Sequence, residues 1–212
     1  MAQIMAHLPM VATRTSVENT VPTYSANTAV GKVVSVTATP NSGAVDLYGD
    51  DEIAESVTTP TQETIALNTT TVPLSAVSVM FGVTATNTSE ASESLTAKNV
   101  KFGSEQTPFV GFGFIDVELV ENVKTYVVNF YPRTKFQRPA GTYNTRGQTV
   151  QFGTPTVNGV AYFDDEYGAL KDEYHYTGTG AAAAAIAKLK ALCGVVSTPA
   201  TIVVEDNNGG AE

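Results

Sequence analysis

The sequence has little of what catalytic and metal sites are built from. Its 212 residues include two histidines, one cysteine and no tryptophan. The Gly-x-Ser-x-Gly, His-Glu-x-x-His, Walker and calcium-loop patterns do not occur. We therefore predict a protein that is not an enzyme, with no catalytic, cofactor-binding or metal-binding residues. His175 follows several acids, but their spacing fits no metal loop, so we interpret it as a surface histidine in an acidic turn. His7 has still less support as a site residue.

A single cysteine excludes an internal disulfide framework and fits folding in a reducing cytosol. Cys193 falls on the apolar stripe of an expected helix, together with Ile186 and Leu189. A small core residue is therefore a better interpretation than a nucleophile. Gly111-x-Gly113 lacks the third glycine of a phosphate-binding loop. Glycines that alternate with phenylalanine in a strand more often mark close packing against aromatic rings.

Charge is also scarce. Charged residues make up 16% of the chain, against about 25% in a typical soluble domain. The net charge of −9 makes the protein a poor candidate for gripping nucleic acid, because phosphate binding needs clustered lysine and arginine. The N-terminus has neither a basic start nor a long apolar core, and no run approaches the roughly 20 residues of a membrane helix, so we expect no signal peptide and no membrane span. Low charge with many threonines fits two alternatives: an ordinary sandwich with a neutral surface, or a surface hidden against other chains.

The most strongly patterned stretch is a long antiparallel hairpin. Residues 109–119 and 123–131 alternate apolar and other residues with a period of two, and Glu121-Asn122 separates them. The apolar side of the first arm switches after Phe114, so that Ile115 continues it on the other face. The switch indicates either a bulge or a strand covered on both sides, and the second would point to a neighbour such as another copy of the chain.

Weaker patterns predict the remaining elements. Helices are expected over 73–81, from a first-turn proline to Gly82, and over 181–194, from the five-alanine run to Gly194. Residues 83–96 are expected to form a loop, and Asn158-Gly159 favours a hairpin turn slightly over a glycine kink within one strand. Pro40 to Gly43 predicts a turn between two strands, and 49–52 an acidic loop. Strands are expected at 31–39, 44–48, 61–67, 171–176 and 195–204, and residues 98–103 are either a short strand or the lead into the central hairpin.

The predicted fold is mainly β: an antiparallel β-sandwich or barrel with a flanking short helix and long hairpins, plus a C-terminal Ala-rich helix. Residues 1–30 are expected to be an extended N-terminal arm that orders against neighbouring chains. Residues 31–177 would form the β-sandwich domain. Residues 178–212 would add the C-terminal helix and a tail extension, and both terminal segments are candidates for contacts between assembled copies.

Charges of opposite sign gather in two stretches. Between Asp46 and Glu55 there are five acids and no base, and between Arg133 and Arg146 four bases and no acid. They are either two solvated loops or complementary patches that meet across subunits of an assembly.

Six stretches in one order carry a family resemblance. The hairpin ends in an aromatic-Tyr-Pro-basic pattern at 130–133, which is followed by Lys-Phe-x-x-Pro at 135–139, Thr-x-Gly at 145–147 and Val-x-Phe-x-Thr-Pro-Thr-Val-x-Gly at 150–159. Earlier stretches at 38–52 and 73–82 match in the same order. From about Lys32 to Tyr176 the chain resembles the major tail proteins of long-tailed bacteriophages, the phi13-type tail tube family.

The resemblance implies a tail tube subunit. Six copies would form a ring whose hairpins join into a continuous inner β-barrel, and stacked rings would form a tube in the virion. Implied partners are other copies, the tail terminator, the baseplate or tail-tip proteins and the tape measure protein. The protein would be made in the host bacterial cytoplasm. Viral DNA would pass through the lumen without specific binding, because lumen carboxylates repel a polyanion. Asp116 and Glu118 are our first candidates for lumen acids.

Two other classes remain open. An Ig-like adhesion or binding module, secreted or at a cell surface, shares the threonine-rich β pattern, although it would usually carry a secretion signal or anchor. A small acidic hydrolase on a β-barrel lacks its catalytic set here. The tube of a phage-derived particle is a related structural alternative. Rings or tubes in electron micrographs would favour the tail protein, and dispersed monomers the adhesion module.

Overall fold

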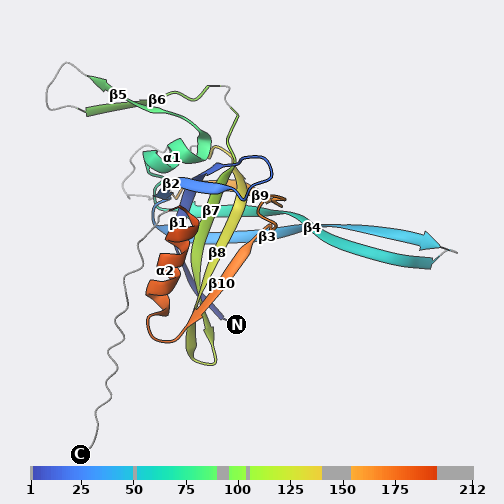
Figure 1. Cartoon of the computed structure of the whole chain (residues 1–212). Coiled ribbons are helices and arrows are strands. Elements are labelled where there is room, and N and C mark those ends of the chain that lie inside the picture. The colour runs from blue at the N-terminus through green and yellow to red at the C-terminus, as the bar shows by residue number, and fades with distance from the viewer. Residues whose placement is uncertain (1, 50–51, 90–95, 104–105, 140–153, 195–212) are drawn as a thin grey trace, which may run out of the picture.

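The computed structural model describes residues 2–49, 52–89, 96–103, 106–139 and 154–194 (Figure 1). This part of the chain is mainly β with two helices, as predicted, and its strands form an eight-stranded antiparallel sheet and a separate two-stranded hairpin. The sheet runs in the order β2-β1-β7-β8-β9-β4-β3, and β10 also pairs with β8. The elements are β1 Ala2–Thr15, β2 Thr23–Ala29, β3 Val33–Gly49, β4 Glu52–Thr69, α1 Leu74–Phe81, β5 Ala85–Ser89, β6 Thr96–Val100, β7 Val110–Val120, β8 Val123–Phe136, β9 Thr156–Tyr162, β10 Asp172–Thr177 and α2 Ala181–Leu192.

The predicted central hairpin is confirmed as β7 and β8. Val120 pairs with Val123, so the turn consists of two residues, Glu121 and Asn122, with φ angles of 50° and 64°. Two positive φ angles are the signature of a type I′ turn, whose twist matches that of the flanking strands. The hairpin lies in the middle of the sheet, with β1 beyond β7 and with β9 and β10 beyond β8.

The hairpin is covered on both faces, which explains the switch of its apolar side. Phe112 and Phe114 belong to a core shared with β4, β9 and α1. On the opposite face, Ile115 and Phe130 belong to a second core, which contains Leu189 of α2. The second cover therefore comes from the chain's own C-terminal helix, and the strand needs no neighbouring copy to hide this face.

Two glycines of β7 allow the residues that cover the hairpin to pack close to its backbone. A Cβ placed on Gly111 would lie 2.6 Å from the ring of Tyr24, and one on Gly113 would lie 2.5 Å from Cδ1 of Leu189. Both distances are below any contact that real Cβ atoms make, so only glycine fits. The predicted role of Gly111-x-Gly113 as a site of close packing is confirmed, and Gly113 accommodates a helix residue as well as an aromatic ring.

The prediction of an extended N-terminal arm is wrong for the described residues up to 30. They form β1 and β2, and β1 pairs with β7 along its length. Val11 and Ala12 are completely buried. The alternation was hidden because the register of β1 shifts twice, the second time between His7 and Met10, around Leu8 with its φ of 54°. A bulge of this kind moves later side chains to the other face and spoils the period of two.

Two predicted turns lie inside strands. Pro40 to Gly43 falls within β3, which runs unbroken to Gly49, so the turn prediction is wrong there. An edge strand tolerates a proline whose missing N–H faces away from the ladder. Asn158-Gly159 lies within β9, as in the less favoured alternative. A Cβ on Gly159 would lie 2.7 Å from the Phe136 ring, which explains the glycine without a turn.

The other predicted elements have mixed outcomes. The helix over 73–81 is confirmed as α1, with Pro73 before it and Gly82 left-handed after it. The Ala-rich helix is confirmed as α2, and β10 confirms the closing strand. The loop over 83–96 is wrong in part, because β5 and β6 form a hairpin there. The strand expected at 195–204 lies outside the described residues.

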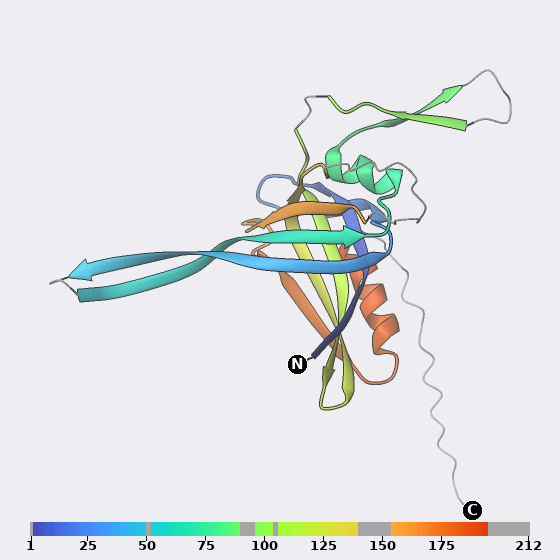
Figure 2. The ribbon, with the colours of Figure 1, turned by 180° about the vertical axis from the view of Figure 1, so that it is seen from behind.

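A long two-stranded arm leaves the body of the molecule (Figures 1 and 2). Strand β4 pairs with β9 only from Gln62 onward, whereas β3 and β4 continue pairing with each other as far as Gly49 and Glu52. We call residues 41–49 and 52–61 the arm. At about 3.3 Å per residue, its strands extend roughly 25 Å beyond the sheet.

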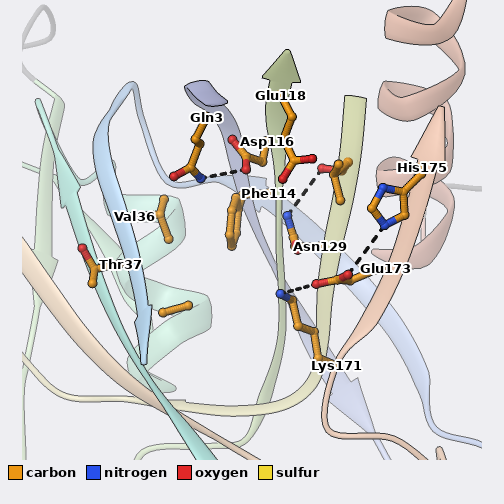
Figure 3. Close-up of a pocket in the computed structure, with 12 residues that line it drawn as sticks. Gln3, Val36, Thr37, Phe114, Asp116, Glu118, Asn129, Lys171, Glu173 and His175 are labelled. Atoms are coloured by element: carbon orange, nitrogen blue, oxygen red, sulfur yellow. Dashed lines mark hydrogen bonds and ion pairs between the residues drawn. The ribbon is translucent and has the colours of Figure 1, made fainter. Parts of the chain in front are cut away.

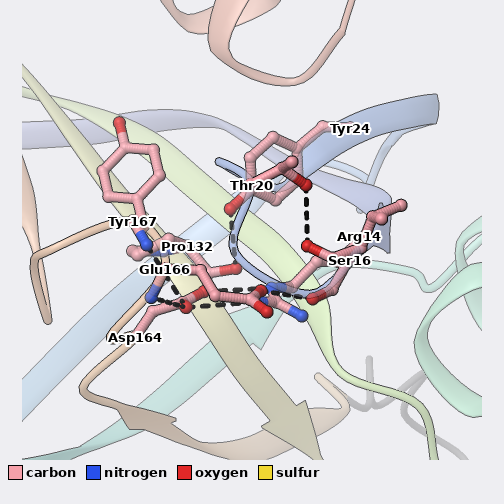
Figure 4. A network of polar contacts seen from close by, with 9 residues as sticks. Arg14, Ser16, Thr20, Tyr24, Pro132, Asp164, Glu166 and Tyr167 are labelled. Atoms are coloured by element: carbon pink, nitrogen blue, oxygen red, sulfur yellow. Dashed lines mark hydrogen bonds and ion pairs between the residues drawn. The ribbon is translucent and has the colours of Figure 1, made fainter.

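A buried ion pair fastens the end of β1 to the turn before β10 (Figure 4). Nε and Nη2 of Arg14 each donate to a carboxylate oxygen of Asp164 at 3.0 Å, and Nη2 also donates to Glu166 at 2.9 Å. Ser16 donates to Glu166 as well. The side chains of Arg14 and Asp164 are only 10% and 2% exposed, so neither charge could be solvated if the other were removed.

We predict that Arg14→Met lowers the free energy of unfolding by about 3–5 kcal/mol, because it leaves the Asp164 carboxylate buried without a counter-charge. Urea denaturation of the monomeric chain measures this. Lys171→Met, which removes an ion pair at a half-exposed site, should cost less than about 1 kcal/mol. Equal losses of unfolding free energy in the two variants would contradict the conclusion that Arg14 forms a buried, stabilising ion pair.

Candidate functional site

Away from the arm, the sheet consists of four strands, and its two faces differ in polarity. Residues 2–7 of β1 pair with β7, β7 pairs with β8, and β8 pairs with β10. We call this part the four-strand region. On one face Val128 and Phe130 pack with Ala185 and Leu189 of α2, and the rings of Tyr174 and Tyr176 lie against the same cluster. This face is therefore a closed apolar core.

The opposite face is polar and hollow (Figure 3). Because side chains alternate along a strand, the residues that interleave with the apolar ones all point this way. Here β3 crosses above the sheet and leaves a hollow of about 370 Å³. Its walls are formed by Gln3, Val36, Thr37, Ala38, Phe114, Asp116, Glu118, Val127, Asn129, Lys171, Glu173 and His175.

Two carboxylates on β7 point into the hollow, and each keeps one oxygen without a partner. Nε2 of Gln3 donates to Oδ2 of Asp116 at 2.7 Å. Oδ1 of Asp116 and Oε2 of Glu118 are buried and accept no hydrogen bond in the structure. Asp116 is only 6% exposed, although it lies beyond the last aromatic residue of the covered half of β7. The polar half of the hairpin thus carries negative charge that the chain itself neutralises poorly.

Charged side chains of β10 and of Lys171, which directly precedes it, form the other wall. Nζ of Lys171 lies 2.5 Å from Oε1 of Glu173, and Nε2 of His175 lies 3.6 Å from Oε2 of the same carboxylate. The hydrogen bond from Lys171 is the main reason that the pKa of Glu173 is lowered, and partial burial acts in the opposite direction. Because the pKa of Glu173 is lower in the folded state, its ionised carboxylate stabilises the fold at pH values above its ordinary pKa of 4.5. This stabilisation is lost as the pH falls through the lowered pKa.

The hollow is therefore an acidic surface. Its lining includes the carboxylates of Asp116, Glu118 and Glu173, against the cation of Lys171 and the imidazole of His175. Three carboxyl groups thus face one lysine and one histidine. Such a surface repels polyanions, and its field is strengthened by the low-dielectric walls around it.

The structure separates the acids that precede His175 in the sequence. Glu173 is the acid paired with His175, whereas Asp164 and Glu166 bind Arg14. Asp172 accepts hydrogen bonds from two tyrosines at 2.8 Å. His7 lies in β1 opposite Ile115. In the described part of the chain, no group of three or more histidine, cysteine, aspartate or glutamate side chains could hold a metal ion.

Cys193 is a core residue, as predicted. It is completely buried beside Leu189 in the second core, and burial raises the pKa of its thiol to about 12. A thiol with so high a pKa carries almost no thiolate at neutral pH, which makes it unreactive as a nucleophile.

Sequence reasoning missed several residues of the hollow. It identified Asp116 and Glu118, which the structure brings together with Gln3, Lys171 and Glu173. A signal for β10 was present, because charged residues at 171, 173 and 175 alternate with Asp172 and two tyrosines. Gln3 gave no signal, since its place depends on the register of β1.

The two stretches of opposite charge lie apart in the fold. Residues 46–49 and 52–55 are at the far end of the arm, whereas Arg133, Lys135 and Arg138 lie along the end of β8 and just after it. Arg146 lies outside the described residues. Whether the two stretches meet between copies stays a prediction.

No known protein-family model matches the chain, and no curated protein matches its sequence. Within the residues that the structure describes, neither helix has the length and apolar character needed to cross a lipid bilayer.

We predict that Lys171→Met raises the pKa of Glu173 toward 4.5, because the hydrogen bond that stabilises the ionised carboxylate is lost. A carbon-13 NMR titration of the glutamate carboxyl groups measures the change. Lys124→Met, at the exposed tip of the central hairpin, is the control and should leave Glu173 unchanged. An unaltered titration of Glu173 in the Lys171 variant would contradict the proposed ion pair.

Proposed function

We propose that the chain is a structural subunit of a phage tail tube, in which copies join into rings and the rings stack into a hollow tube that conducts viral DNA. The proposal joins the family resemblance of residues 32–176 to the form of the four-strand region. It assigns the work of the protein to an assembled cavity, so no catalytic residue, cofactor or metal is required.

The observation that carries the proposal is a pair of free sheet edges. Among the described residues, no strand pairs with the outer edge of Ala2–His7 or with the outer edge of Asp172–Thr177. Exposed edges invite pairing with another chain, and natural proteins usually block them. Two unblocked edges on opposite sides of one four-strand region favour copies that join side by side.

The directions of the strands are compatible with copies that join edge to edge in a ring. The four strands alternate in direction, because each of the three pairings is antiparallel. The two edge strands therefore run in opposite directions, and copies related by rotation about a common axis would meet in antiparallel pairing. A closed ring formed in this way leaves no edge. The sandwich-like body and the inner barrel of the tail tube fold belong to this proposal.

The two faces suggest which side would line the channel. Helix α2 and its core cover one face, so that face would lie outside the barrel. The acidic hollow would then face the lumen, with Asp116, Glu118 and Glu173 repelling the DNA backbone so that it slides without sticking. With six copies of four strands, the barrel would have about 24 strands, and barrels of 16–18 strands already hold an aqueous channel.

The remaining assignments follow from the resemblance. The tube would lie in the virion tail, after synthesis in the host bacterial cytoplasm, and no membrane contact is proposed. The tail terminator, the baseplate or tail-tip proteins and the tape measure protein would be its partners.

We predict that Met5→Asp prevents ring assembly and leaves the monomer folded. Met5 is 54% exposed on the free edge of β1 and pairs opposite Val117, so its side chain lies on the same face as α2. In a ring it would be covered by the next copy, where a charge is costly to bury. Sedimentation velocity and electron microscopy measure assembly, and circular dichroism measures folding.

Val21→Asp is the matched control, since Val21 is 66% exposed and precedes β2, away from the two free edges. It should assemble like the unmodified protein. Rings formed equally well by the Met5 variant would argue against edge joining at β1. Dispersed monomers of the unmodified protein at high concentration would instead favour a binding module of the Ig-like class.

A further inference from the structure

Three cations at the end of β8 form a surface that makes no ion pair within the described part of the chain. We call Arg133, Lys135 and Arg138 the basic strip. The guanidinium of Arg133 lies 4.4 Å from the ring centroid of Phe109, and Nζ of Lys135 lies 5.5 Å from the same ring. The guanidinium of Arg138 lies 4.2 Å from the ring centroid of Phe102. None of the three makes an ion pair with any described residue.

The strip has a buried donor as well as exposed charge. Nε of Arg133 is shielded from solvent and has no hydrogen-bond acceptor among the described residues. The hydrogen bond from Ser16 is the main reason that the pKa of Glu166 is lowered, the one from Arg14 adds to it, and the charge of Arg133 contributes least. That carboxylate is therefore already held by other residues. The aromatic rings orient the cations without neutralising them, because a ring offers only its quadrupole. The aromatic rings therefore hold the cations of the basic strip in place, and the strip keeps its positive charge.

The arm supplies the complementary charge in the same chain. The sequence has five acids and no base between residues 46 and 55. Three of them belong to the strands at the far end of the arm: Asp46 to β3, and Glu52 and Glu55 to β4. In the described part of the chain, the arm strands pair only with each other. An isolated two-stranded hairpin is marginally stable in water, so an arm of this length is expected to rest on another surface.

The arm cannot reach its own basic strip in this fold. In both opposite views the paired strands β3 and β4 of the arm extend away from the body (Figures 1 and 2), whereas the strip lies where β8 pairs with β9. We propose that the arm of one copy docks on the basic strip of a neighbouring copy, so that carboxylates of the arm meet Lys135 and Arg138. The inference rests on the proposed function, since it names the contact by which assembled copies are held in register.

Electrostatic complementarity of this kind fixes register and speeds encounter more than it adds affinity. Each exposed pair contributes little alone and is screened by salt. The proposal therefore requires assembly to weaken as the ionic strength rises, and it requires the two surfaces to depend on each other.

A charge-exchange experiment on the full chain tests this dependence. One variant carries Lys135→Glu and Arg138→Glu, which leaves the partly buried Arg133 in place. A second carries Glu52→Lys and Glu55→Lys, and a third combines all four changes. The matched control, Lys32→Glu with Lys190→Glu, makes the same charge change at two exposed sites outside both surfaces. Circular dichroism verifies folding, and electron microscopy with sedimentation velocity measures assembly at several salt concentrations.

We expect the first two variants to assemble at least about tenfold more weakly than the unmodified protein, because like charges would then face each other. The combined variant should recover most of the loss, and the control should assemble normally. Three results would overturn the docking: single-surface variants that assemble normally, a combined variant that does not recover, or a control as impaired as the others. Rings of the unmodified protein would still uphold the proposed function in each case. An unmodified protein that stays monomeric at every concentration would overturn both.

Discussion

The rest of the structure depends on close packing against both faces of β7. A strand in the middle of a sheet has two faces, and both must be covered or solvated. In the first half of β7 both faces are covered, by the core around Phe112 on one side and by α2 on the other. The second cover fits only because Gly113 leaves room for Leu189. Beyond Phe114 the apolar core on one face ends, and that face lines the acidic hollow.

Much of the fold could be predicted from periodicity. The central hairpin, both helices and the closing strand have strong local signals, and the glycines at 111 and 113 indicated close packing. The failures have a common physical cause, because they occur where tertiary contacts decide the structure. β1 contains bulges that break its period, and Pro40 is tolerated inside β3 because an edge strand need not donate every N–H.

The candidate site could be predicted only in part for a related reason. Asp116 and Glu118 interrupt an apolar pattern within one strand, and that interruption is visible locally. The partners of these acids come from β1 and β10, which are far away in the sequence. No local pattern specifies which strand lies beside another, so Gln3 and Lys171 emerge only from the assembled sheet.

The proposed assembly gives one account of several features that are otherwise unrelated. An apolar face closed by α2, a polar face with excess carboxylate and two free edges are what a segment of a larger barrel requires. An acidic arm, and a basic strip that makes no ion pair with any residue the structure describes, are what a second contact between copies requires. The low overall charge fits a chain that hides much of its surface against its own copies.

Hydrogen–deuterium exchange of assembled and dissociated protein tests most directly whether copies complete each other's sheets. Roughly half of the backbone amides of an edge strand point outward and exchange freely unless another strand pairs with them. The account predicts slower exchange within Ala2–His7 and Asp172–Thr177 together on assembly, with little change in the already paired β7. Unchanged exchange at both edges in particles that have assembled would contradict it.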